Sequence, residues 1–251
     1  MSFNVAGRGA LITGAASGIG LAASRSMLGK GLQSLVAYDL NPSLPDVAEE
    51  LRKEFPGTEI ITHVADVTDP TSLQAAFATP LDGGRALSIV SNNAGIGGAD
   101  WEKTLAVDLS AVIMGTSMGL ARFKKEAAGG VIVNVASMAG LAPMSFDPVY
   151  TAAKHGVVGY SRCFQHLIKK GIRVNCLCPA FTDTPLVQGL VDDPKFGPAG
   201  KMAIESLGGL IPMENVVSAF MGLVEDEDNN GAVMTVTNAH GIMPMKFPLD
   251  P

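Results

Sequence analysis

The chain has few charged residues and no long apolar run, and each shortage excludes a class of partner. Charged residues make up 17% of the 251 positions, and 24 acidic against 18 basic residues give a net charge of −6. This balance argues against nucleic acid or an anionic membrane surface as a partner. No apolar run reaches the roughly 18 residues that a membrane-spanning helix needs, so we predict no membrane partner.

Cysteine is also scarce. The three cysteines, Cys163, Cys176 and Cys178, are an odd number without the spacing of a disulfide scaffold, which favours a reducing compartment. They have no companion ligands in the sequence, so we predict no metal site. The segment Met1-Ser2-Phe3-Asn4 lacks the charge and apolar core of a secretion signal, and we expect a cytoplasmic location.

Apolar runs alternate with segments of helical character along the whole chain. Strands are predicted near 9–13, 33–38, 58–65, 86–91, 131–136, 172–178 and 232–237. Helices are predicted near 18–30, 46–55, 70–78, 101–125, 150–170 and 214–225. The length and the 47% hydrophobic content suit one core. We therefore predict an α/β fold with one domain over 1–251, built on a doubly wound parallel sheet of about seven strands with helices on both faces.

A glycine-rich turn follows the first predicted strand. Gly14, Gly18 and Gly20 lie where the strand 9–13 gives way to a helix, together with Ser17 and Ile19. Small residues there let the backbone approach a pyrophosphate, which the exposed N–H groups and the positive helix end attract. The turn predicts a dinucleotide site in a Rossmann-type fold.

Asp39 ends the second predicted strand, about twenty residues beyond that turn. A carboxylate at this point accepts hydrogen bonds from the adenosine ribose hydroxyls and would repel a 2′-phosphate. Its neighbours Leu40, Asn41 and Pro42 carry no positive charge that would attract such a phosphate. We therefore expect NAD rather than NADP as the cofactor.

Tyr150 and Lys154 are one helical turn apart on the same predicted helix face. A tyrosine phenol, with a pKa of ~10, is a poor base at neutral pH. An ammonium about 4 Å away would favour the phenolate by about three pKa units at an effective dielectric constant of ~20. Ser137 can both donate and accept, and it could hold a substrate oxygen beside the phenol. These three residues predict a catalytic group for hydride transfer from an alcohol.

Taken in order along nearly the whole chain, these motifs resemble the short-chain dehydrogenase/reductase family. The resemblance also rests on Asp66-Val67, on Asn92-Asn93-Ala94-Gly95, and on Pro179 with Thr184 after the sixth strand. Within the family, Trp101–Leu105, Pro148–Tyr150 and Val224–Asp226 are similar to NAD-dependent hydroxyprostaglandin dehydrogenase-like members. The resemblance implies that the cofactor is contacted by the turn and by Asp39, Leu40, Asp66, Val67, Asn92, Ala94, Gly95, Tyr150, Lys154, Pro179, Ala180, Thr182 and Thr184.

The chain departs from the family pattern at two positions. Asp108 stands where many members have an asparagine, in a kinked helix segment whose main-chain carbonyl holds a water that relays protons to the lysine. Asp108 is counted with the catalytic residues: its backbone can keep that role, while its carboxylate pairs with Lys154 or perturbs it. Slower proton relay and lower activity are the alternative. Ala180 replaces a usual glycine, and its methyl group restricts the backbone there.

Substrate residues are harder to identify. The resemblance implies a lid over 185–212, and in this chain the lid is largely apolar and includes Leu186. Met138 and Met144 could line the same space, as could the tail residues Met243, Met245 and Phe247, because methionine adapts to irregular shapes. The alternative for these Met and Phe residues is core or interface packing. Asp147 lies where similar enzymes carry a polar residue that orients the substrate.

Together these residues predict an NAD-dependent enzyme that interconverts a secondary alcohol and a ketone with an apolar or aromatic group. The alternatives are an NADP-dependent carbonyl reductase, a sugar or polyol dehydrogenase, and a non-catalytic dinucleotide-binding sensor or structural subunit. The apolar lid speaks against a polyol substrate. The resemblance further implies a homotetramer or homodimer, joined through the helices predicted over 101–125 and 150–170.

Overall fold

A computed structural model describes residues 3–98, 100–127 and 129–247; the ends of the predicted domain, 1–2 and 248–251, lie outside this range. The fold is built on one eight-stranded sheet in the order β3-β2-β1-β4-β5-β6-β7-β8, parallel up to β7. The strand order reverses between β1 and β4, which is where open α/β sheets bind ligands. The strands are β1 Gly9–Thr13, β2 Ser34–Asp39, β3 Glu59–Val64, β4 Leu87–Asn92, β5 Gly130–Val135, β6 Ile172–Pro179, β7 Val233–Thr237 and β8 Gly241–Pro244.

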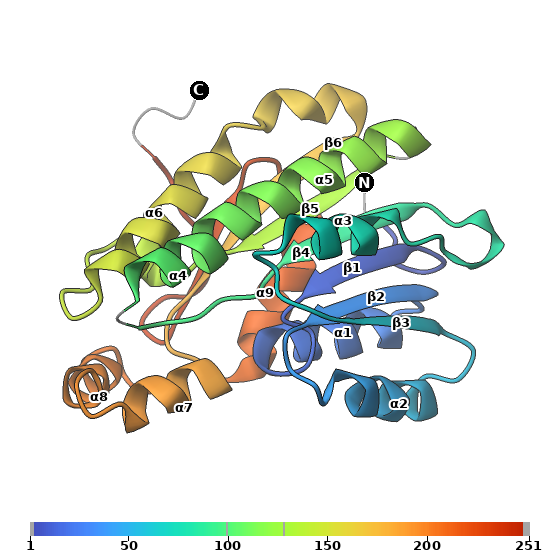
Figure 1. Ribbon diagram of the computed structural model, residues 1–251. Coiled ribbons are helices and arrows are strands. Elements are labelled where there is room, and N and C mark those ends of the chain that lie inside the picture. Colours follow the sequence, from blue (N-terminus) through green and yellow to red (C-terminus); the bar gives the residue numbers. More distant parts are fainter. Residues whose placement is uncertain (1–2, 99, 128, 248–251) are drawn as a thin grey trace.

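Helices cover both faces of the sheet, as predicted (Figure 1). They are α1 Gly18–Gly29, α2 Leu44–Glu54, α3 Pro70–Ala78, α4 Trp101–Leu105, α5 Ala111–Glu126, α6 Pro148–Arg162, α7 Pro185–Asp192, α8 Gly197–Ser206 and α9 Met213–Glu225. In the view of Figure 1, α3, α5 and α6 lie above the sheet, and α1, α2 and α9 lie below it.

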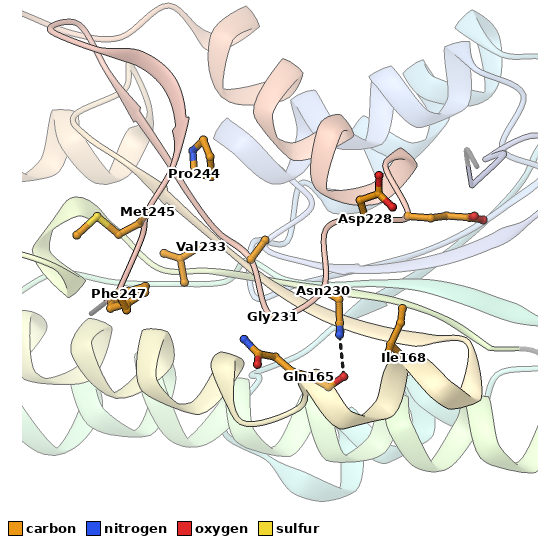
Figure 2. Close-up of a pocket in the computed structure, with 11 residues that line it drawn as sticks. Gln165, Ile168, Asp228, Asn230, Gly231, Val233, Pro244, Met245 and Phe247 are labelled. Atoms are coloured by element: carbon orange, nitrogen blue, oxygen red, sulfur yellow. Dashed lines mark hydrogen bonds between the residues drawn. The ribbon is translucent and has the colours of Figure 1, made fainter. Parts of the chain in front are cut away.

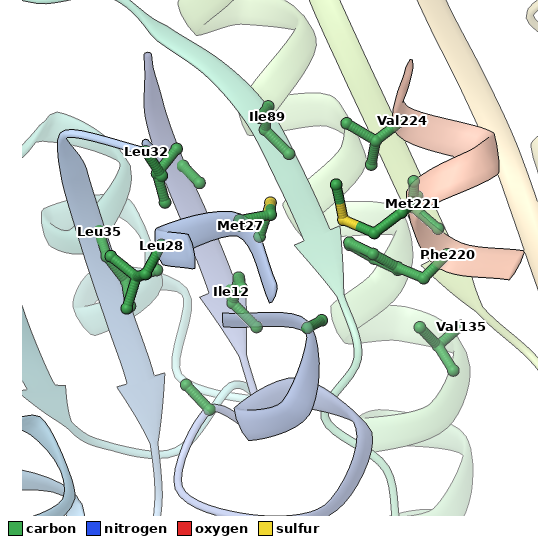
Figure 3. Packing of buried hydrophobic residues seen from close by; sticks show 14 of the residues in the cluster. Ile12, Met27, Leu28, Leu32, Leu35, Ile89, Val135, Phe220, Met221 and Val224 are labelled. Atoms are coloured by element: carbon green, nitrogen blue, oxygen red, sulfur yellow. The ribbon is translucent and has the colours of Figure 1, made fainter. Parts of the chain in front are cut away.

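Successive residues of the central strands point to opposite faces of the sheet and pack in two different hydrophobic clusters. Leu11 of β1 packs in the cluster that includes Phe77 of α3 and Phe123 of α5. Its neighbour Ile12 packs in the opposite cluster with Met27 of α1 and Phe220 of α9, as Figure 3 shows. This alternation follows from the two-residue period of a strand. Because both faces are covered, these strands are buried throughout their length, and most of their residues are apolar.

A buried polar network fixes α5 and α6 to the sheet. The amide nitrogen of Asn92 in β4 donates to Asn134 in β5 at 2.8 Å and to Thr116 in α5 at 3.1 Å. The amide nitrogen of Asn134 in turn donates to Ser161 in α6 at 3.0 Å. All four side chains are buried, so each hydrogen bond saves the cost of an unpaired polar group.

The seven predicted parallel strands are confirmed, and the sheet has one further strand, β8, that was not predicted. β8 pairs antiparallel with β7, with Thr235 opposite Met243. All four of its residues are exposed, so it has neither the buried run nor the alternation that marks a strand in sequence. Its last residue, Pro244, is tolerated because an edge strand has one side that needs no donor.

Two predicted long helices are interrupted. The helix predicted over 101–125 contains one turn of π-helix, Ala106–Ser110, between α4 and α5. The helix predicted over 150–170 begins two residues earlier, capped by Asp147, and ends at Arg162; a 3-10 segment, Gln165–Lys170, follows. By length and composition alone Trp101–Glu126 could cross a membrane, but α5 packs against β4 and β5 as a core helix does.

We expect Gly115→Ala to destabilise the protein. Gly115 lies in α5 against Asn92, and an added methyl carbon would lie 2.0 Å from the Asn92 side-chain oxygen. Overpacking of this kind costs about 1–3 kcal/mol, which we expect as a loss in the free energy of unfolding in urea. Gly159→Ala in α6 is the matched control, because an added carbon there meets nothing within 4 Å. Equal stability of the two variants would contradict the proposed contact.

Candidate active site

The candidate site lies at the carboxyl edge of the sheet. Parallel pairing brings the ends of β1, β2, β4, β5 and β6 to this one edge, so motifs distant in sequence meet there. The glycine turn follows β1, Asp39 ends β2, and Asn92 ends β4. The predicted catalytic residue Ser137 follows β5 by two residues, and Pro179 ends β6.

The glycine turn is tightly closed. Gly14 and Gly18 have positive φ angles of 68° and 52°, which favour glycine. A methyl carbon on Gly20 would lie only 2.1 Å from the carbonyl oxygen of Gly14. Ser17 precedes α1, and Ile19 lies in the first turn, so the N-terminal amides of α1 lie at this edge. The backbone is therefore accessible in the way that a pyrophosphate requires.

Asn93 and Thr13 hold this turn to the end of β4. The Asn93 amide nitrogen donates to the carbonyl oxygens of Thr13 at 3.0 Å and Gly14 at 3.1 Å. The Thr13 hydroxyl accepts from the backbone nitrogens of Asn93 and Ala94. The predicted motif includes Asn93, but the residue predicted to contact the cofactor is Asn92. The Asn92 side chain is buried between strands and helices and does not reach the edge. The sequence shows two adjacent asparagines, but only the strand register tells which of the two side chains faces the glycine turn.

Asp39 contacts the turn directly. Its carboxylate accepts from the backbone nitrogen of Ala16 at 2.8 Å and from that of Asn41 at 2.9 Å. The Leu40 side chain is 61% exposed. At the next strand end, the Asp66 carboxylate accepts from the backbone and hydroxyl of Thr68, and Val67 packs in the core beneath. Asp66 therefore shapes its own loop, while Asp39 links two strand ends.

Ser137, Tyr150 and Lys154 come together as predicted. Tyr150 and Lys154 lie one turn apart in α6, and the lysine nitrogen is 5.3 Å from the centre of the tyrosine ring. Burial raises the pKa of the Tyr150 phenol, and hydrogen bonding by Ser137 acts against that rise, so the serine lies beside the phenol. Lys154 also donates to the carbonyl oxygen of Val135 at 3.3 Å, so it is held from the end of β5.

Asp108 forms an ion pair with Lys154. Its Oδ1 lies 3.4 Å from the lysine nitrogen, with side-chain exposures of 0% and 3%. The same oxygen accepts from the backbone nitrogen of Ile96 at 3.0 Å, whereas Oδ2 is buried without a partner among the described residues. Gly95 makes room for this pair, since a methyl carbon there would lie 2.8 Å from Asp108 Oδ1. From the sequence, the Asp108 carboxylate could either pair with Lys154 or perturb it, and in the structure it forms the pair.

Burial shifts the pKa of all three groups. It raises the pKa of the Tyr150 phenol more than Lys154 lowers it, and Asp108 adds to the rise. Burial also raises the pKa of Asp108, against the effect of Lys154. For Lys154, burial lowers the pKa, but Asp108 and Tyr150 outweigh it and the pKa is raised. The expectation that Lys154 brings the phenol near neutrality is therefore wrong for the protein alone, because burial and Asp108 oppose it.

The segment after β6 is tied down by backbone contacts. Pro179 ends β6, and Ala180 donates its backbone N–H to Val236 of β7 at 2.9 Å. The Thr182 hydroxyl donates to Ala180, and the Thr184 hydroxyl donates to Thr182 while capping α7. The methyl group of Ala180 packs against the core and is accommodated.

The predicted lid over 185–212 contains α7 and α8, which lie together at the lower left of Figure 1. A methyl carbon on Gly97 would lie 3.8 Å from Leu186 of α7 and 3.9 Å from Asp147, so these residues face the loop after β4. Both Asp147 oxygens are occupied: they accept from the backbone nitrogens of Tyr150 at 3.1 Å and Gly98 at 3.2 Å. Asp147 therefore caps α6, and its role in orienting the substrate stays a prediction, because each carboxylate oxygen can accept a further hydrogen bond.

Of the predicted apolar walls, Met138 and Met144 lie in the segment that follows Ser137, and the tail residues lie elsewhere. Met138 packs against the core cluster around α6, and Met144 is partly buried in the loop before that helix. Met245 and Phe247 line a separate hollow of about 490 Å³ with Gln165 and Asn230, near the start of β7 (Figure 2). Because β8 runs antiparallel to β7, it carries the tail away from the carboxyl edge. The tail residues that are described are thus not part of the candidate site.

No group of three His, Cys, Asp or Glu side chains suited to a metal ion occurs in the range that the structure describes. The sulfurs of Cys176 and Cys178 are 3.8 Å apart and buried.

Known proteins of one enzyme family are similar to this chain along most of its length. A model of the short chain dehydrogenase family matches residues 8–195. The chain is 34% identical to the 15-hydroxyprostaglandin dehydrogenase [NAD(+)] of Mus musculus, over 99% of this chain and 96% of that protein. It is 33% identical to the cis-4-hydroxycyclohexanecarboxylate dehydrogenase of Sinomonas cyclohexanicum, over 93% and 96%.

Among solved structures, levodione reductase superposes with a TM-score of 0.83 at 25% identity, covering 93% of this chain and 97% of its own. Sequence motifs, topology and full-length similarity therefore agree, and the chain belongs to the short-chain dehydrogenase family of oxidoreductases.

Proposed function

We propose that this oxidoreductase interconverts a secondary alcohol and a ketone with NAD(H) as cofactor. The observation that carries the proposal is the contact of Ser137 and Lys154 with Tyr150 at the edge where the glycine turn also lies. The turn fits a dinucleotide because glycines with positive φ at positions 14 and 18 bring the N-terminal amides of α1 to this edge. When bound, NAD supplies the hydride acceptor, or NADH the hydride donor.

The protein's own residues manage the proton. In alcohol oxidation, Tyr150 acts as general base and its oxygen takes the hydroxyl proton, while the carbon gives up its hydrogen with both electrons. Ser137 positions the alcohol oxygen next to the phenol. Lys154 stabilises the phenolate that must form first. In ketone reduction, Tyr150 acts as the acid and returns the proton.

The negative charge of Asp39, where the adenosine ribose would bind, supports NAD as the cofactor. Asp39 is held against the turn, and its neighbours Leu40 and Asn41 carry no charge. The similar 15-hydroxyprostaglandin dehydrogenases carry NAD(+) in their names. A 2′-phosphate would meet the Asp39 carboxylate with no compensating cation from these neighbours.

An apolar substrate is supported by the lid. Exposed apolar side chains on and after α7 and α8 include Leu186, Met202, Leu207 and Leu210. Similar proteins are named for hydroxyprostaglandin, hydroxycyclohexanecarboxylate and levodione. Each of these names denotes a carbon compound with an alcohol or keto group. We propose a ketone or secondary alcohol with an alkyl or aryl group as the substrate class.

We expect Tyr150→Phe to abolish turnover while cofactor binding persists. With NADH and a panel of alkyl and aryl ketones, loss of NADH absorbance should be at least about a hundredfold slower in the variant. Quenching of NADH fluorescence on binding should remain. Tyr160→Phe is the matched control, since Tyr160 lies in the same helix and its hydroxyl only reaches the carbonyl oxygen of Ile113 at 3.4 Å.

Two results would reject the proposed reaction. Turnover that survives in Tyr150→Phe would remove Tyr150 from the mechanism. Binding of NADH with no turnover by the unaltered protein over the whole panel would favour the non-catalytic sensor instead.

We expect Asp39→Asn to relax the choice of cofactor. The amide oxygen can still accept from Ala16, but the negative charge is lost, so kcat/KM for NADPH relative to NADH should rise at least about tenfold. Asp46→Asn serves as the control, because Asp46 is an exposed residue of the nearby α2. A preference for NADPH in the unaltered protein would overturn the assignment of NAD.

We also propose a homodimer or homotetramer joined through α5 and α6. These helices form one outer layer of the fold, and Ile113 of α5 is 36% exposed there. Light scattering should give a mass of two or four times the 25.9 kDa chain, and Ile113→Glu should lower it. A monomeric mass for the unaltered protein would reject this interface.

A further inference from the structure

Lys154 is a single buried cation that faces two acidic groups. Asp108, in the π-helical turn, lies 3.4 Å from the lysine nitrogen, and the centre of the Tyr150 ring lies 5.3 Å from it. Asp108 is fully buried and Lys154 is 3% exposed. In such a place, an ammonium is stable only with a negative partner.

Burial raises the pKa of the Asp108 carboxyl, while Lys154 and the backbone nitrogen of Ile96 favour its charged form. Its Oδ1 accepts from both Lys154 and the backbone nitrogen of Ile96. Among the described residues, the other ionisable groups that face the pair are Asp147, at the start of α6, and Cys176 and Cys178, in β6. Asp147 accepts from two backbone N–H groups, whereas Asp108 is the carboxylate that forms an ion pair with the lysine.

We propose that Asp108 competes with the Tyr150 phenolate for the charge of Lys154, and so sets the pH at which Tyr150 becomes a base. Asp108 is then a positioning residue that acts through Lys154. With an uncharged residue at this position, the phenolate would be the only opposite charge adjacent to the ammonium. With Asp108 present, the ammonium is already neutralised, and the phenolate forms at higher pH.

The proposal rests on the proposed function for its consequence in catalysis. Alcohol oxidation needs the phenolate, whereas ketone reduction needs the protonated phenol. By keeping the phenol protonated to higher pH, Asp108 favours ketone reduction at neutral pH. The raised pKa of Tyr150, to which burial contributes most and Asp108 contributes in the same direction, agrees with this geometry.

The direct test is the titration of Tyr150 without substrate or cofactor. Its phenolate absorbance is the ultraviolet difference between the protein and its Tyr150→Phe variant. In the Asp108→Asn background, the same difference should give a midpoint lower by about one pH unit or more. Asp46→Asn removes an equal charge from the surface and should leave the midpoint in place. An unchanged midpoint in Asp108→Asn would overturn the proposal.

A second measurement needs no variant at position 108. In the unaltered protein, the carbon-13 carboxyl resonance of Asp108, assigned through its backbone, should have the shift of a carboxylate at neutral pH. A protonated carboxyl there would overturn the proposal, because a neutral Asp108 cannot compete for the lysine charge.

Kinetics separates this proposal from the proposed function. With an active substrate pair, Asp108→Asn should move the acidic limb of kcat/KM for alcohol oxidation down by about one pH unit, or about tenfold in rate below the limb. If Asp108 had only a structural role, Asp108→Asn would lower the rate at every pH without moving the acidic limb. That result would contradict the proposal. If no substrate is turned over but the Tyr150 midpoint still shifts, the proposed function fails and the role of Asp108 stands.

Discussion

The structure of the candidate site depends on one buried ammonium. Lys154 reaches the end of β5 through Val135, the π-helical turn through Asp108, and the ring of Tyr150 in its own helix. A buried cation is costly unless its donors are used, so these contacts constrain how α6 and the turn lie against the sheet. Gly95 follows from the same constraint, because a side chain there would collide with the pair.

The π-helical turn is the local device that makes this contact possible. An extra residue in one helical turn changes the direction in which side chains point, and such turns are frequent at functional sites. Here the turn separates α4 from α5 and carries Asp108 inward to 0% exposure. The resemblance to the family implied a kink at this place, but hydrophobic periodicity alone gave one continuous helix.

Backbone amides occupy several carboxylates that appeared available for ligands. Asp147 caps α6, Asp66 shapes its own loop, and Asp39 binds the turn after β1. These bonds do not remove Asp39 from the cofactor site, because each carboxylate oxygen can accept more than one hydrogen bond. They also show how acidic side chains at the carboxyl edge satisfy loop N–H groups that have no strand partner.

The sequence by itself determined the family, the alternation of strands and helices, and the set of Ser137, Tyr150 and Lys154, since these depend on local periodicity and short spacings. Only the tertiary structure decided which way side chains face. It turned Asn92 into the core and Asn93 toward the glycine turn, added the exposed strand β8, and carried Met245 and Phe247 to a separate hollow. It also decided the charge balance at Tyr150, because burial and the contact between Asp108 and Lys154 arise only when α4, α5 and α6 pack on the sheet.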